Sequence, residues 1–408
     1  MAETAQNMLI DKDLRPTYYD DFHCLAGDCR LSCCKGSWSI SFNKKDYLSL
    51  KRQSGSQELN ARLENGVRRV RKGPKAEMYY GEFDMDSGVC PLLGEDSLCM
   101  LQKEKGHAAL PRVCRVYPRT ESYMPSGYLE RSLSPSCEGV LALLWELPEG
   151  IGFCSDPLPK AQCKELTPIK GDLPLWFSVV REWCVDLLQN RRFTLAQRIF
   201  LMGLGLKELA DGEEDIKRWM ERAAVLPDVA DTAKLLPTGN PELAMYLSSC
   251  IHTLLKLPSN DANHEAIISG LLKGLELKSH ADVTSLAMPL GPYRETQARY
   301  REQFAGREYF MENLMVSIFF FLHMPSVHSR EELWKGYVNF CNLYAFYHFL
   351  AVMSCRKDAP GDRDELFSLI VFASRSLIHS GQRQSLLRDE FFKNDSATLA
   401  HMAILLCG

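Results

Sequence analysis

The sequence lacks the features that would place the protein in a membrane, in a secretory pathway or on nucleic acid. Its longest apolar run, 314–324, is interrupted by Ser317 and His323 and is shorter than the ~20 residues that a membrane-spanning helix needs. Residues 1–15 contain no apolar stretch of the kind found in secretory signals, which predicts a cytoplasmic location. A net charge of −4 leaves no overall positive field, so we expect no nucleic-acid partner.

Several cofactor-binding patterns are also missing. The glycine fingerprint of dinucleotide-binding folds follows a strand, whereas Gly203 and Gly205 lie inside an apolar helical pattern, where helix packing explains them better. The ferredoxin run C-x2-C-x2-C-x3-C-P is absent, as is the C-x3-C-x2-C loop of radical enzymes that use S-adenosylmethionine. The sequence therefore assigns no catalytic residue and no residue that binds an organic cofactor.

The distribution of Gly, Pro and apolar residues divides the chain into a loop-rich first third and a helical remainder. We predict a cysteine-rich metal-binding domain over residues 1–146, a linker over 147–174 and a helical domain over 175–408. Strands and helices do not alternate. The expected fold class is therefore mainly α, with a loop-rich cysteine-cluster N-terminal domain followed by an all-helical C-terminal domain.

Apolar periodicity and capping residues predict the individual helices. In the first third we expect a helix from Lys44 to about Asn65 and a short one from Glu138 to Trp145. Two residue pairs fit the capping box. In this motif the side chain of the residue before the helix bonds to the amide three residues later, and the side chain of that later residue bonds back to the amide of the first. These pairs are Thr194 with Gln197 and Ser329 with Glu332. The helices expected in the second half are 175–189, 195–210, 241–256, 262–276, 293–323, 330–354, 363–380 and 396–406.

Cysteine is the residue type whose placement is most informative. The chain has 15 cysteines, and a reducing cytosol would keep them as thiols that can bind metal. We predict that the eight cysteines of the first third ligate metal and that the remaining ones are small core residues. The eight predicted ligands are Cys24, Cys29, Cys33, Cys34, Cys90, Cys99, Cys114 and Cys137.

The ligand type limits the metal without fixing it. Thiolates select zinc, copper(I) or iron–sulfur clusters over magnesium, calcium and manganese. The spacing Cys29-x3-Cys33 occurs in zinc knuckles as well as in cluster loops. Eight thiols exceed the four ligands of one cluster, so either two sites exist or only some of the thiols ligate. The adjacent Cys33 and Cys34 are not expected to face the same metal.

Three segments that carry these cysteines resemble a known family. Residues 22–38 contain Cys-x4-Cys-x3-Cys-Cys-Lys-Gly-Ser-Trp, and residues 89–119 contain Leu-Pro-Arg-Val-Cys-Arg-Val-Tyr-Pro-Arg. Together with residues 129–138 they are similar to the flagellin lysine N-methylases of enteric bacteria. The cysteines alone also resemble the broader group of zinc- or iron-chelating cysteine-cluster proteins. The length of the chain and its helical second half favour the methylases.

The resemblance implies an enzyme that transfers a methyl group from S-adenosylmethionine to surface lysines of flagellin in the cytoplasm. It also implies an iron–sulfur cluster, of the 4Fe-4S type, with zinc as the alternative metal. Only the metal role is carried over to this chain, and only to the eight cysteines. The alternative function is a non-enzymatic helical adaptor or scaffold that binds zinc or iron.

Other polar and aromatic residues have a functional and a structural interpretation. Near the cysteines, tyrosines and carboxylates could take a proton from lysine, although half-buried tyrosines and turn carboxylates are the favoured interpretation. These residues are Tyr79, Tyr80, Asp84, Asp86, Tyr117, Tyr123 and Tyr128. A basic run over residues 68–75 is compatible with peripheral membrane association, and the aromatic segment 318–349 is compatible with an oligomer. A solvated loop and core packing explain these two segments better.

Overall fold

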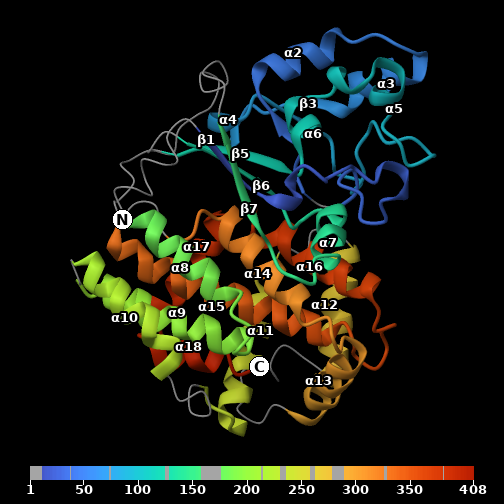
Figure 1. Ribbon diagram of the computed structural model, residues 1–408. Coiled ribbons are helices and arrows are strands. Elements are labelled where there is room, and N and C mark those ends of the chain that lie inside the picture. Colours follow the sequence, from blue (N-terminus) through green and yellow to red (C-terminus); the bar gives the residue numbers. More distant parts are fainter. Residues whose placement is uncertain are drawn as a thin grey trace.

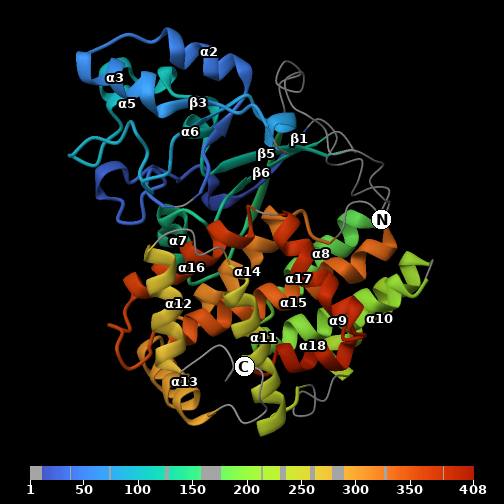
Figure 2. The same ribbon diagram turned by 180° about the vertical axis from the view of Figure 1, so that it is seen from behind.

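The computed structural model describes residues 12–36, 38–72, 75–124, 128–157, 176–212, 215–229, 236–257, 262–277, 289–325, 329–379 and 381–408. A large helical body carries a small cysteine-rich subdomain on one side, and a four-stranded sheet lies between the two (Figures 1 and 2). The predicted fold class is confirmed. The first third is loop-rich with a few short strands, and the secondary structure described from residue 176 onward is helical.

The four-stranded sheet joins segments from both ends of the first third. Its strand order is β5-β6-β1-β7, in which β1 is parallel to β6 and the other two pairs are antiparallel. The strands are β1 (Lys12–Pro16), β5 (Arg119–Tyr123), β6 (Leu129–Leu133) and β7 (Phe153–Pro157). The stretch predicted as a linker, 147–174, thus contains strand β7, and its residues 158–174 lie outside the described residues.

The subdomain has its own small hydrophobic core, which includes Phe42, Leu59 and Leu101. A three-stranded antiparallel sheet of order β2-β4-β3 lies beside short helices. The elements of the subdomain are β2 (Ser41–Phe42), α2 (Lys44–Arg52), α3 (Gln57–Gly66), β3 (Val67–Arg69), α4 (Lys75–Met78), β4 (Gly81–Phe83), α5 (Met100–Lys105), η3 (His107–Ala109) and α6 (Arg112–Val116). Two 3-10 helices, η1 (Thr17–Tyr19) and η2 (Ala26–Asp28), precede them.

The prediction of one continuous helix from Lys44 to about Asn65 is wrong, because the chain forms two helices there. The backbone becomes extended at Gln53, where ψ is 144°. Ser56 then starts α3 by accepting a hydrogen bond from the amide of Leu59 at 3.1 Å. A serine cap satisfies a free amide of the first turn, so this residue favours a new helix over continuation of the old one.

The helical body is organised around its longest helix, α15, which contacts α9, α11, α13, α16, α17 and α18. The helices after the four-stranded sheet are α8 (Phe177–Leu188), α9 (Leu195–Ala210), α10 (Ile216–Val229), α11 (Asn240–Leu255), α12 (Ala262–Gly274), α13 (Gly291–Gln303), α14 (Tyr309–Phe321), α15 (Arg330–Met353), α16 (Arg363–Leu377), α17 (Gly381–Lys393) and α18 (Leu399–Leu405). Within the described part of the chain, none of these helices combines the length and the apolar character needed to cross a membrane.

Most of the predicted helices of this half are confirmed, with two kinds of error. The prediction over 293–323 is wrong in joining α13 and α14, which are separated by a turn at Gly306 with a φ of +76°. Helices α10 and α17 were not predicted.

The capping box at Thr194 is complete: its hydroxyl accepts from the amide of Gln197 at 3.3 Å, and the Gln197 side chain accepts from the Thr194 amide at 3.0 Å. Ser329 accepts from the amide of Glu332 at 3.3 Å.

Helix packing explains the two glycines of α9, as predicted. The side chain of Tyr337 from α15 fills the space where a Cβ of Gly203 would lie. The indole of Trp183 from α8 approaches Gly205 in the same way. These glycines let the neighbouring helices approach α9 closely.

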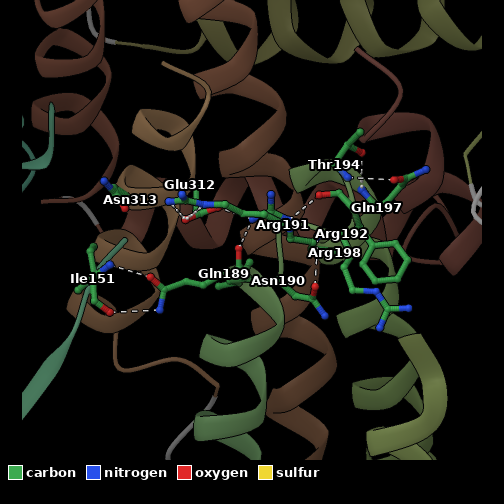
Figure 3. Close-up of polar contacts among 12 residues, drawn as sticks. Ile151, Gln189, Asn190, Arg191, Arg192, Thr194, Gln197, Arg198, Glu312 and Asn313 are labelled. Carbon is green, nitrogen blue, oxygen red and sulfur yellow. Dashed lines mark hydrogen bonds and ion pairs between the residues drawn. The ribbon is translucent and has the colours of Figure 1, made fainter. Parts of the chain in front are cut away.

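Buried ion pairs fasten the sheet to the helical body and join helices within that body. Glu130 of β6 accepts two hydrogen bonds from Arg181 of α8, at 2.7 and 2.8 Å, and a third contact from His323 at 2.9 Å. Figure 3 shows a second network, in which Arg191 and Arg198 converge on Glu312 of α14. The main hydrophobic core continues without interruption from the sheet and α7 (Glu138–Trp145) into the helices.

Candidate functional site

Four of the predicted ligands pack against the core of the subdomain. A short antiparallel bridge places Cys34 beside Cys90, whose amide donates to the carbonyl of Cys34 at 2.8 Å. Cys99 is the N-cap residue of α5, and Cys114 lies in α6. The local fold therefore brings together cysteines that are far apart in sequence, and all four contribute to one apolar cluster.

The other four lie toward the helical body, where α7 begins. They are Cys24, Cys29, Cys33 and Cys137. Cys137 is the N-cap residue of α7, and the next residue, Glu138, has a buried carboxylate. That carboxylate accepts from the amide of Leu31 at 2.9 Å and from Arg30 at 2.8 Å, and it lies 3.4 Å from the thiol of Cys29. These contacts fix the first cysteine loop to the start of α7.

The thiols are close enough to influence one another. Burial, then Glu138 and the neighbouring thiols, raise the pKa of Cys29 to about 12. Burial also raises the pKa of Cys137 to about 11, with a contribution from Cys33. A hydrogen bond to Cys34, followed by burial, raises the pKa of Cys33. Cys33 and Cys34 therefore connect the two groups of thiols.

The chemistry of this donor set fits a soft metal. Buried neighbouring thiols resist ionisation because their thiolates would repel one another, and a bound metal cation removes that penalty. Among the described residues, no group of three or more His, Cys, Asp or Glu side chains is arranged to hold a single metal ion. In a 4Fe-4S cluster each thiolate binds a different iron atom, so the ligands need not converge on one point. The metal role of the eight cysteines stays a prediction.

A histidine from the helical body lies against the loop that precedes Cys137. The Nε2 atom of His379, just after α16, is 2.7 Å from the hydroxyl oxygen of Ser136 and 3.1 Å from that of Ser134. The hydroxyl of Tyr117 is 2.9 Å from the same Ser136 oxygen. Sequence analysis did not identify His379, because this contact joins residues that no local pattern connects.

An arginine and a tryptophan connect this histidine to the first cysteine loop. The indole N–H of Trp38 donates to the carbonyl of Cys33 at 3.0 Å, and the guanidinium of Arg375 lies 4.9 Å from the centre of the Trp38 ring. Arg375 also donates to the carbonyls of Leu31 and Lys35. A positive charge is therefore held beside Cys33, where it partly opposes the rise in the pKa of that thiol.

The carboxylates considered from the sequence have structural partners. Asp84 and Asp86 both form ion pairs with Arg68 of the basic run. Tyr80 packs against Tyr47 with a ring separation of 5.2 Å. Tyr117, another of the tyrosines considered, contacts the serine–histidine cluster through Ser136.

Two surface grooves are lined by residues other than the predicted metal ligands and His379. One, of about 480 Å³, is lined by residues that include Arg62, Asp84 and Pro91. The other, of about 440 Å³, lies between α11, α17 and α18 and is lined by residues that include His252 and Glu390. Neither lining contains a predicted metal ligand or His379, while the first groove includes Val89 and Pro91, the residues on either side of Cys90.

One family model matches the helical part of the chain. A family model described as "FliB lysine N-methylase C-terminal domain" matches residues 181–405, more than half of the 408-residue chain. This match covers the helical body, including His379, whereas the sequence resemblance rests on the cysteine segments. No solved structure matches.

Curated relatives align with a shorter part of the chain. The lysine-N-methylase of Salmonella choleraesuis (strain SC-B67) is 30% identical over 148 residues, which is 34% of this chain and 33% of the relative. The lysine-N-methylase of Salmonella typhimurium (strain LT2) is 29% identical over 143 residues, with shares of 34% and 33%. The flagellar biosynthetic protein FliU of Salmonella muenchen is 29% identical over 143 residues, with shares of 34% and 79%.

The matched part of the chain thus spans about a third of the length of the two lysine N-methylases. The family model is the broader match, because it extends over most of the helical body. It confirms the family resemblance seen in the sequence, and the chain belongs to the FliB lysine N-methylase family.

Proposed function

We propose that this chain transfers methyl groups from S-adenosylmethionine to lysine ε-amines of flagellin. The family match over residues 181–405 carries the reaction class, and the two curated relatives named lysine-N-methylase support it. The relative named as a flagellar biosynthetic protein supports flagellin as the acceptor. The methyl donor rests on the resemblance of the cysteine segments.

The proposal includes an iron–sulfur cluster held by the N-terminal thiols. One group of candidate ligands surrounds Cys34 and Cys90 in the subdomain, and the other lies near Cys29 and Cys137 at the start of α7. When bound, such a cluster supplies iron that can accept electrons or polarise a ligand. The support is the soft donor type of the ligands and their grouping in space.

A structural zinc site is the second candidate for these thiols, and one observation favours it. The subdomain core is small, and small cores commonly need a metal for stability. In that case the protein would be a metal-stabilised helical adaptor or scaffold. Metal identity and methyl transfer together distinguish the two proposals.

The reaction places a clear demand on the protein. A lysine must lose its ammonium proton before its nitrogen can attack a methyl group, and nitrogen, carbon and sulfur must lie in line. A site that desolvates the ammonium or places a cation beside it favours the neutral amine. Both features lie near the start of α7: the aromatic ring of Trp38 can displace water from the ammonium, and the guanidinium of Arg375 supplies the neighbouring positive charge.

The experiment is a methyl-transfer assay with anaerobically purified protein, flagellin and S-adenosylmethionine, read by the intact mass of flagellin. We expect mass to be added in steps of one methyl group, at positions that peptide mapping assigns to lysine. Flagellin whose lysines have been acetylated beforehand is the control and should gain nothing. If metal-loaded protein adds no mass to unmodified flagellin, the proposed function is wrong.

A further inference from the structure

His379 combines a fixed orientation with access to solvent. Part of the side chain reaches solvent, while the ring packs against neighbouring residues and its Nε2 atom contacts the hydroxyls of Ser134 and Ser136. If Nε2 carries the proton and donates it to Ser136, the lone pair is on Nδ1. Within the described residues, Nδ1 has no hydrogen-bond partner, so that lone pair is available to a molecule that approaches from solvent.

Aromatic rings surround the imidazole on several sides. The ring centre of His379 lies 5.6 Å from that of Trp38, 6.1 Å from that of Phe321 and 6.5 Å from that of Tyr117. These three residues are partly exposed, so the rings flank the imidazole at the surface. Apolar side chains beside an incoming ammonium group displace water from it and so favour its neutral form.

The charged and titratable groups around the imidazole favour its neutral form. Burial of the ring, followed by the positive charge of Arg375, lowers the pKa of His379 below its ordinary value. Burial raises the pKa of Tyr117, so its hydroxyl stays protonated. The thiols of Cys33 and Cys137 lie within electrostatic range of Tyr117. At neutral pH the imidazole is therefore uncharged, and its lowered pKa makes it a weaker base than a free histidine.

We propose that His379 is the catalytic base of the methyl transfer and accepts the ammonium proton of the target lysine at Nδ1. This inference rests on the proposed function and deepens it by placing the acceptor lysine at the junction of α16 with the cysteine loops. Ser136 is a positioning residue, because it holds Nε2 and leaves Nδ1 facing away from the loop.

The step balances in atoms and charge. The ammonium proton of lysine passes to Nδ1 of His379, which leaves a neutral amine and an imidazolium. The amine nitrogen then attacks the methyl carbon of the sulfonium donor, so a nitrogen–carbon bond forms and the carbon–sulfur bond breaks. The bonding electron pair stays on sulfur, which becomes a neutral thioether, and the positive charge passes to the methylated nitrogen, now an N-methylammonium. His379 then returns its proton to solvent.

Two other histidines among the described residues are less suited to act as the catalytic base. His323 contacts the buried carboxylate of Glu130, and that contact occupies its Nδ1. His252 forms an ion pair with Glu390 in the groove between α11 and α17, away from the cysteines. His252 therefore offers a matched control that removes a histidine without touching the site.

The test compares His379→Gln, His379→Ala and the control His252→Gln in the flagellin assay across a range of pH. Because general bases contribute roughly a hundredfold or more, we expect both His379 variants to lose about that factor at neutral pH, with the control unchanged. In the His379 variants the rate should rise in proportion to hydroxide concentration, because the lysine must lose its proton to solvent. Added imidazole should partly restore His379→Ala.

Metal content and thermal unfolding of each variant separate a catalytic loss from a folding defect. We expect both to match the unsubstituted protein in His379→Gln. If both His379 variants keep the full rate, or if imidazole restores nothing to a folded His379→Ala, the assignment of the base is wrong while the methylase proposal stands. If the unsubstituted protein methylates no flagellin, the proposed function fails and this inference fails with it.

Discussion

The Nε2 atom of His379 lies 2.7 Å from the hydroxyl oxygen of Ser136, although 243 positions separate the two residues in the chain. Ser136 directly precedes Cys137, and His379 follows α16 within the region that the family model matches. The helical body is therefore more than a support for the cysteine loops. It contributes a side chain that can exchange protons beside the predicted metal ligands.

We expect the buried ion pair between Glu130 and Arg181 to be the main polar interaction that stabilises the packing of the sheet on the helical body. Their side chains are 0% and 6% exposed. Replacing Glu130 with Gln leaves the buried guanidinium without a carboxylate, which should lower the free energy of unfolding by about 3–5 kcal/mol. Urea denaturation followed by circular dichroism measures this loss.

An exposed ion pair serves as the control for that substitution. Arg192 and Asp228 form an ion pair in which both side chains are more than 60% exposed. Asp228→Asn should therefore cost less than about 1 kcal/mol. Equal losses in the two variants would show that burial does not set the contribution of Glu130.

The same carboxylate should make the protein sensitive to acid. Burial alone would raise the pKa of Glu130, but Arg181 and His323 outweigh that effect and hold it at about 2. Since an unfolded glutamate titrates near about 4.3, this stabilisation is present above that pH and is lost as the pH falls toward 2. Urea titrations between those two pH values should show a smaller acid-induced loss in Glu130→Gln. Identical slopes would contradict the ion-pair explanation.

Gly203 should tolerate no larger residue, because Tyr337 occupies the space beside it. Gly203→Ala forces α9 and α15 apart and should cost about 1–3 kcal/mol of unfolding free energy. Gly291 begins α13 and has no atom within 4 Å of an added Cβ, so Gly291→Ala should be neutral or stabilise by up to about 1 kcal/mol. Thermal melts compare the two, and a stable Gly203→Ala variant would refute the packing argument.

Local sequence signals predicted the parts of the fold that depend on local chemistry. The reciprocal hydrogen bonds of Thr194 and Gln197 formed as expected, and the helix from Glu138 to Trp145 has the predicted bounds. The break at Gly306 was missed because apolar periodicity continues on both sides of it. Periodicity reports which face of a segment is buried, but it does not reveal a single residue in a left-handed conformation.

The parts that depend on distant contacts could not be predicted. Strand β1 has five residues and pairs with β6 and β7, which follow more than a hundred positions later, so no short window reveals the sheet. The cysteine spacing predicted a metal site but not the division of the predicted ligands between the subdomain and the start of α7. His379 carries no local signal at all, since its role depends on where α16 ends against the loop of Ser136.

The most direct test of this account is the amount of iron, sulfide and zinc per chain in anaerobically purified protein. We predict iron and acid-labile sulfide in equal amounts, with little zinc, in the unsubstituted protein and in the control Cys154→Ser. Both should be lost when Cys29, Cys33, Cys90 and Cys114 are replaced together by serine. Stoichiometric zinc without iron or sulfide, or unchanged metal in the fourfold variant, would contradict the claim that these thiols hold an iron–sulfur cluster.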